Sequence, residues 1–118
     1  MKKVEHLFTD KKVSYYFGAG FSYLQQIVPQ QNTIVITDEN VFASHAAKFA
    51  GFKTIVIKAG EQYKQQATLD YIFQQLIALE ADRKTFIVGV GGGVVTDIVG
   101  YAASVYMRGL KFGFVPTT

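Results

Sequence analysis

The stretch that most constrains the fold runs from Thr85 to Thr118 in a chain of 118 residues. An apolar β-type run at 86–90 leads directly into three glycines at 91–93, and a long segment of apolar and small residues follows them, with Asp97 in its predicted first helical turn. A second β-type run covers 112–115. Strand, glycine turn, helix and strand in this order predict a βαβ unit.

The three glycines favour a site for a nucleotide phosphate. Glycine accepts the backbone angles that a sharp turn from strand to helix needs, and its missing side chain lets a ligand approach the backbone. The following helix start offers unpaired N–H groups and the positive end of the helix dipole to an anion. A tight turn without a ligand is the alternative, although three consecutive glycines exceed what a turn needs. The dinucleotide fingerprint is incomplete, because Val94 stands where a third glycine or alanine is usual.

The rest of the chain alternates strand-like and helix-like segments. We expect β-type runs at 4–8 and 13–17 that pair as a hairpin or flank an edge, helices at 21–28, 41–50 and 68–81, and buried strands at 33–37 and 54–57. This alternation predicts an α/β fold with a doubly wound, mainly parallel sheet and flanking helices. In such sheets ligands bind beyond the carboxyl ends of the strands, where the polar or glycine-rich segments 38–40, 60–64, 91–97 and 117–118 follow.

Composition excludes several classes of protein. The chain has no cysteine and therefore neither a disulfide framework nor a thiolate metal site. Its net charge of +3 comes from scattered lysines, which form no basic stripe for nucleic acid. No apolar run reaches membrane-spanning length, so we expect a cytoplasmic protein that binds neither membrane nor nucleic acid. His6 and His45 lack partners at ligand spacing, and we expect no metal site within the chain.

The motifs also carry a family resemblance. GGGVVTDIVGYAASVYMRG at 91–109, followed by FVPTT, closely resembles the N-terminal domain of 3-dehydroquinate synthase, as does the loop GEQYK at 60–64. The resemblance runs over essentially the whole chain and is specific from Gly60 onward, with TDENV at 37–41 a weaker match. It implies that residues 1–118 form one Rossmann-like, NAD-binding domain. In the family a mostly helical domain follows, which holds a divalent metal (zinc or cobalt) on a glutamate and two histidines.

The resemblance implies an activity for the whole enzyme. That enzyme is a carbon–oxygen lyase of the shikimate pathway to aromatic amino acids, and it closes 3-deoxy-D-arabino-heptulosonate 7-phosphate into 3-dehydroquinate with release of phosphate. We expect a homodimer whose NAD-binding half is this truncated chain, which lacks the helical domain and is inactive alone. The alternatives are a related sugar-phosphate cyclase such as 2-deoxy-scyllo-inosose synthase, an iron-dependent or glycerol-type alcohol dehydrogenase, and a non-catalytic nucleotide-binding stub. The dehydrogenase reading expects Ala-Lys where Gly100-Tyr101 stands.

The resemblance also implies roles for individual residues. Those at the pyrophosphate are Gly92, Gly93, Val94, Val95, Thr96 and Asp97, and those of the loop beside the adenosine ribose are Gly60, Glu61, Gln62, Tyr63 and Lys64. Asp38 matches an acid near the adenosine end, Thr117 and Thr118 match a pair at the nicotinamide, and Arg108 matches an arginine that reaches the substrate phosphate of a neighbouring subunit.

Two positions depart from the family, and some residues have simpler readings. Thr96 stands where glycine is usual, and it either narrows the approach to the phosphates or offers its hydroxyl as a ligand. Ala59 replaces a common acidic residue, which weakens the ribose contact. Asp97 suits the helix dipole even without a ligand. Glu61 and Lys64 suit an exposed loop pair of little energetic weight.

Overall fold

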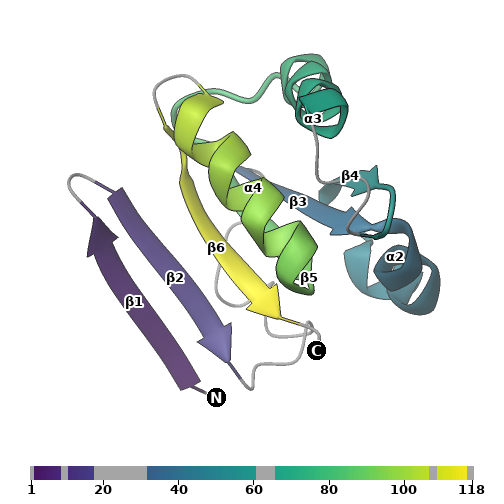
Figure 1. The fold of residues 1–118 in the computed structure, drawn as a ribbon, viewed down its shortest axis with the longest axis horizontal. Helices are drawn as coiled ribbons and strands as arrows, with labels where there is room; N and C mark the ends of the chain where they lie inside the picture. Colours follow the sequence, from purple (N-terminus) through teal and green to yellow (C-terminus); the bar gives the residue numbers. More distant parts are fainter. Residues whose placement is uncertain (1, 9–10, 18–31, 61–65, 107–108, 117–118) are drawn as a thin grey trace.

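The fold is built on one six-stranded sheet. The computed structural model describes residues 2–8, 11–17, 32–60, 66–106 and 109–116 (Figure 1). Within them the strands are β1 (Lys2–Phe8), β2 (Lys11–Phe17), β3 (Thr33–Asp38), β4 (Lys53–Ile57), β5 (Phe86–Gly91) and β6 (Lys111–Pro116). The helices are α2 (Glu39–His45), the 3-10 turn η3 (Ala46–Phe49), α3 (Gln66–Ala78) and α4 (Gly93–Val105). The predicted helix at 21–28 lies outside the described residues.

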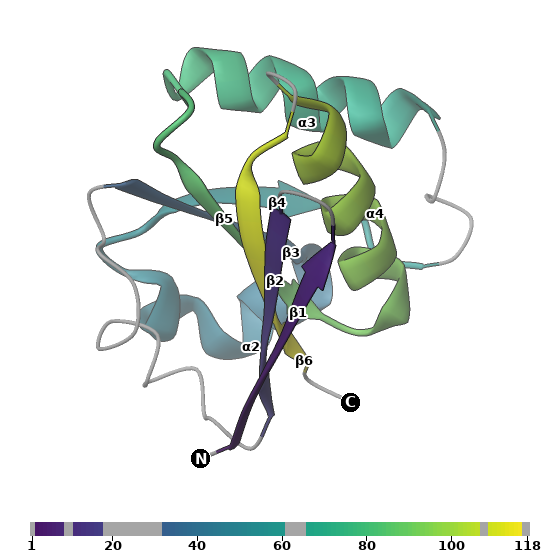
Figure 2. The same cartoon turned by 90° about the vertical axis from the view of Figure 1, so that its left-hand side faces the viewer.

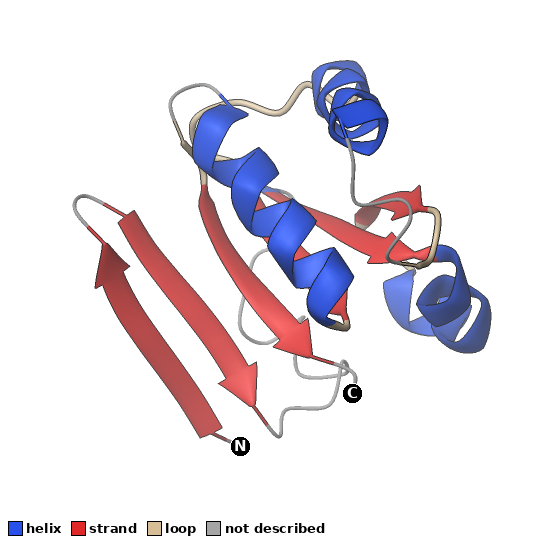
Figure 3. Cartoon of the chain, in the orientation of Figure 1, coloured by secondary structure: helices blue, strands red, loops and turns tan. Residues whose placement is uncertain are grey.

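The sheet is mainly parallel, as predicted. Its strand order is β1-β2-β6-β5-β3-β4, and every neighbouring pair from β2 to β4 is parallel. β1 pairs antiparallel with β2 from Lys2↔Phe17 to Phe8↔Lys11 and forms the edge of the sheet. The predicted pairing of runs 4–8 and 13–17 as a hairpin is therefore confirmed, and the βαβ unit β5-α4-β6 is present (Figure 3).

Helices cover both faces of the sheet, which makes the fold doubly wound (Figure 2). Alternate residues of each strand point to opposite faces. On β3, Ile34 and Ile36 pack with α3 and α4, whereas Val35 packs in the second core beside Phe49 and Phe52. The first core also holds Ile55, Ile57, Ile72, Leu76, Ile87, Val95, Ile98, Val99, Ala102, Ala103, Leu110, Phe112 and Phe114, and the second holds Val88, Val90 and Val115. Strands with apolar residues on both faces explain the near-continuous apolar runs in the sequence.

Close packing of α4 on the sheet depends on Gly89 in β5. A Cβ at this position would lie 3.1 Å from Val99 on α4 and 3.2 Å from Phe114 on β6. Such contacts are tighter than most real Cβ contacts, so a side chain here would push the helix outward. At the far end of the helix, Leu110 N donates to Ala103 O at 2.7 Å and holds the returning chain against it.

Two helical predictions need correction. The segment predicted as a helix at 41–50 begins earlier, at Glu39, because Asp38 caps it, and it turns into a 3-10 helix after His45. Asp97 does not lie in the first turn of α4, which holds no acidic residue. The helix starts at Gly93 with Gly92 as its N-cap, so Asp97 is its fifth residue. No described helix is both long and apolar enough to cross a membrane.

Candidate functional site: the crevice between β3 and β5

The connections that leave the two central strands, β3 and β5, run to opposite sides. The chain leaves β3 through α2 and returns in β4 on one side, whereas it leaves β5 through α4 and returns in β6 on the other side. The helices α2 and α4 lie against opposite faces of the sheet. Adjacent parallel strands with such opposite connections open a crevice beyond their carboxyl ends, and this is where open α/β sheets bind ligands. We use the word crevice for the region beyond Asp38 and Gly91, where this rule places a ligand.

The three glycines at this crevice differ in what the fold requires of them. Gly91 has φ 156°, and a Cβ there would lie 2.8 Å from Cγ2 of Val95, so the packing of α4 demands glycine. Gly92 is the N-cap of α4 and has no side chain with which to cap it. Gly93 is exposed, and a Cβ added to it would meet nothing within 4 Å. The fold does not need glycine at 93, and its bare backbone leaves open space at the start of the helix.

The start of α4 presents backbone donors to this space. Thr96 N donates to Gly92 O at 3.1 Å, which closes the first turn. The N–H groups of residues 93–95 precede that bond and have no acceptor within the helix. Val95 is buried beneath the turn, so its side chain is not accessible at this surface. Thr96 Oγ1 donates to Gly93 O at 3.1 Å, which turns its hydroxyl back onto the helix. The predicted anion site thus consists of backbone groups.

Two adjacent residues at the end of β3 fix both sides of the crevice. Thr37 is fully buried, and its Oγ1 donates to Val90 O on β5 at 2.8 Å. Asp38 Oδ1 accepts from Val41 N at 2.8 Å and caps α2. Sequence reasoning singled out Asp38 for a ligand but missed Thr37, whose partner lies 53 residues away in the sequence.

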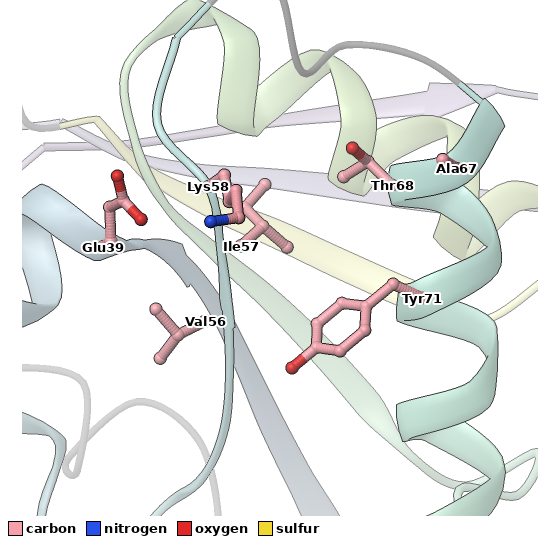
Figure 4. Close-up of a pocket in the computed structure, with 7 residues that line it drawn as sticks. All are labelled: Glu39, Val56, Ile57, Lys58, Ala67, Thr68 and Tyr71. Atoms are coloured by element: carbon pink, nitrogen blue, oxygen red, sulfur yellow. The ribbon is translucent and has the colours of Figure 1, made fainter.

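A cavity of about 490 Å³ lies next to the crevice, at the carboxyl end of β4 (Figure 4). Glu39 from α2 stands on one side and Tyr71 from α3 on the other, with Lys58 at the end of β4 between them. The rest of the lining is Val56, Ile57, Ala67 and Thr68. An apolar floor with a few polar groups at its rim is typical of a small-molecule pocket. Glu39 belongs to the segment 38–40 that the sequence predicted beyond the end of a strand, whereas the other lining residues were not predicted as site residues.

The remaining predicted site residues divide into two groups. Gly60 follows β4, is exposed and has φ 113°, a conformation that favours glycine. Asp97 is exposed on α4 and Val94 is partly buried there. Glu61, Gln62, Tyr63, Lys64, Arg108, Thr117 and Thr118 lie outside the described residues. Among the residues that are described, no three His, Asp or Glu side chains gather into a group that would hold a metal ion.

Comparison with known proteins decides the family. The model of the family "3-dehydroquinate synthase N-terminal" matches residues 54–118, which span β4 to β6 and include the glycine turn. This chain belongs to the 3-dehydroquinate synthase family. Over 66 residues it is 48% identical to the 3-dehydroquinate synthase of Pyrococcus furiosus, a match that covers 56% of the chain and 20% of that protein. Over 106 residues it is 36% identical to the enzyme of Francisella tularensis, covering 83% of the chain and 30% of that enzyme.

Solved structures of sugar-phosphate cyclases share the fold of this chain. One neighbour is 2-deoxy-scyllo-inosose synthase complexed with carbaglucose-6-phosphate, NAD+ and Co2+. Its TM-score to this chain is 0.76 at 29% identity, and the match covers 99% of the chain and 35% of that structure. The chain therefore spans about a third or less of the relatives it matches.

Proposed function

We propose that residues 1–118 form one NAD-binding domain and supply the nucleotide-binding half of a 3-dehydroquinate synthase. The observation that carries this proposal is the open backbone at Gly93, at the start of α4 and at the switch point of the sheet. A turn that only reversed the chain would require Gly91 but not a second bare position facing open space. A dinucleotide pyrophosphate fits such a helix start, because its charge and its oxygens suit N–H groups that have no acceptor within the helix.

The chain's own residues would bind and orient NAD. The N–H groups at the start of α4 would hold the pyrophosphate, while the buried side chain of Val95 packs that turn against Gly91. Asp38 lies at the side of the crevice that we assign to adenosine, and the loop 60–64 and the pair Thr117 and Thr118 complete the proposed contacts. NAD, when bound, supplies a reversible hydride acceptor. The solved 2-deoxy-scyllo-inosose synthase, which binds NAD+, has the same fold over 99% of this chain and supports the assignment.

The substrate follows from the relatives. The curated relatives at 36% and 48% identity are 3-dehydroquinate synthases, whereas the solved 2-deoxy-scyllo-inosose synthase is 29% identical. We therefore favour cyclisation of 3-deoxy-D-arabino-heptulosonate 7-phosphate to 3-dehydroquinate with loss of phosphate, a step of the shikimate pathway. 2-Deoxy-scyllo-inosose synthesis is the second candidate. We assign Arg108 to the substrate phosphate across a homodimer, and we place the divalent metal, cobalt or zinc, on ligands other than the described residues.

Two measurements test this function. Calorimetric titration of the chain with NAD tests the binding half, and we expect saturable binding of one NAD per chain. Absence of binding would refute it. The complete enzyme that carries this chain should release phosphate from the seven-carbon substrate and not from a hexose 6-phosphate. The reverse preference would favour the second candidate, and NAD binding without any phosphate release would favour the non-catalytic stub.

A further inference from the structure

A buried hydroxyl joins β3 to β5 where their ladder ends. Thr37 is 0% exposed, and its Oγ1 donates to Val90 O at 2.8 Å. Thr37↔Val90 is also the last pair in the β3–β5 register. Beyond this pair the strands separate toward α2 and α4, so the side-chain bond holds them together at the edge of the crevice. A buried hydroxyl without a partner is costly, which keeps this bond formed in the folded chain.

The acceptor of this bond leads directly into the glycine turn. Val90 O belongs to the peptide group that joins Val90 to Gly91, and Gly91 packs so closely against Val95 that a Cβ would lie 2.8 Å away. Val95 lies in the first turn of α4 and is buried. Close-packed contacts of this kind transmit small displacements, because no void absorbs them. The direction of the Val90 carbonyl is thereby linked to the start of the helix.

We propose that Thr37 is a positioning residue for the phosphate-binding turn. Its hydroxyl fixes the Val90–Gly91 peptide and, through Gly91 and Val95, the aim of the N–H groups at the start of α4. The proposal rests on the proposed function, because the anion in question is the NAD pyrophosphate. The orientation of these N–H groups matters because a hydrogen bond weakens steeply when its donor–hydrogen–acceptor angle departs far from linear. Thr37 is fully buried, so it acts only through Val90 and touches no ligand.

The test compares two variants of Thr37, one that lacks the hydroxyl group and one that lacks the methyl group. Thr37→Val keeps the shape and removes the donor, and we expect NAD to bind roughly three- to tenfold more weakly, the fold-change of one neutral hydrogen bond. Thr37→Ser keeps the donor and should bind NAD as the wild-type chain does. The readout is the NAD dissociation constant from calorimetry, with the thermal midpoint measured beside it.

Thr85→Val is the matched control, because Thr85 is another buried threonine at the opposite end of β5. Its Oγ1 accepts from Asp82 N at 2.9 Å, and it is 8% exposed. We expect this variant to lose thermal stability and to keep wild-type affinity for NAD. Wild-type affinity in Thr37→Val, or an equal loss of affinity in Thr85→Val, would overturn the positioning role and leave the proposed function standing. A wild-type chain that does not bind NAD would overturn both.

If Thr37→Val does not fold, the positioning role of Thr37 can be tested on the wild-type chain. With ¹³C labels on the Val90 carbonyl and the Thr37 methyl group, NAD addition should shift both resonances, although neither group contacts the ligand. Unchanged resonances in a chain that demonstrably binds NAD would refute the link.

Discussion

Replacement of Gly93 by alanine tests whether the glycine turn binds a ligand or only connects β5 to α4. Gly93 occupies the first position of α4, has no positive φ, and leaves nothing within 4 Å of an added Cβ. The folded chain should therefore tolerate the methyl group. Because alanine has a higher helix propensity than glycine, the free energy of unfolding should rise by up to about 1 kcal/mol. The same methyl group would occupy the space in which we place the pyrophosphate. Overpacking of a filled contact costs about 1–3 kcal/mol, so NAD binding should weaken by roughly five- to 150-fold.

The assay pairs calorimetric NAD titration with equilibrium unfolding in urea. Gly91→Ala is the matched control two residues away, and its signature should be the opposite. Its Cβ would lie 2.8 Å from Val95 at φ 156°, so we expect a loss of about 1–3 kcal/mol in the free energy of unfolding. Gly93→Ala with wild-type NAD affinity and unchanged stability would refute the reasoning, because open space at 93 would then have no ligand in it.

Three further changes follow from the structure. Asp38→Ala removes the cap on Val41 N and should lower the free energy of unfolding by about 1 kcal/mol in urea titrations, whereas Asp38→Ser should not; an equal loss in both would argue against capping. Glu80 has φ 62° in the turn after α3, so Glu80→Gly should raise the thermal midpoint by relieving about 1 kcal/mol of strain, and a lower midpoint would contradict this. Arg108→Ala in the complete enzyme should raise the KM for the phosphorylated substrate at least tenfold while NAD affinity stays the same, and a matching loss of NAD affinity would move Arg108 to the cofactor.

The strands and the position of the crevice could be predicted from local sequence. Buried strands such as 33–37 are continuous apolar runs, and the glycines after 86–90 mark the turn at the carboxyl end of β5. Alternation of strands and helices then determines on which edge of the sheet ligands bind. These signals come from residues that are neighbours in the sequence. The apolar runs are easy to recognise because a strand that is buried on both faces tolerates few polar residues.

What sequence reasoning missed depends on contacts between distant residues. Three adjacent glycines do not reveal which one caps α4. The sequence therefore predicted Asp97 in the first turn, although it is the fifth residue of a helix that Gly92 caps. Thr37 resembles any strand threonine until Val90, 53 residues later, accepts its hydrogen bond. The cavity at the end of β4 is invisible for the same reason, because its rim residues come from α2, β4 and α3.

The most direct test of the account is NAD titration of the ¹⁵N-labelled chain, followed residue by residue in amide spectra. We predict that the largest shifts fall on the amides of Gly93, Val94 and Val95, because these groups lie at the start of α4 where the pyrophosphate is placed. The spectra should also move little for β1 and β2 at the far edge of the sheet. Saturable NAD binding whose shifts spare the start of α4, or no binding at all, would contradict the central claim.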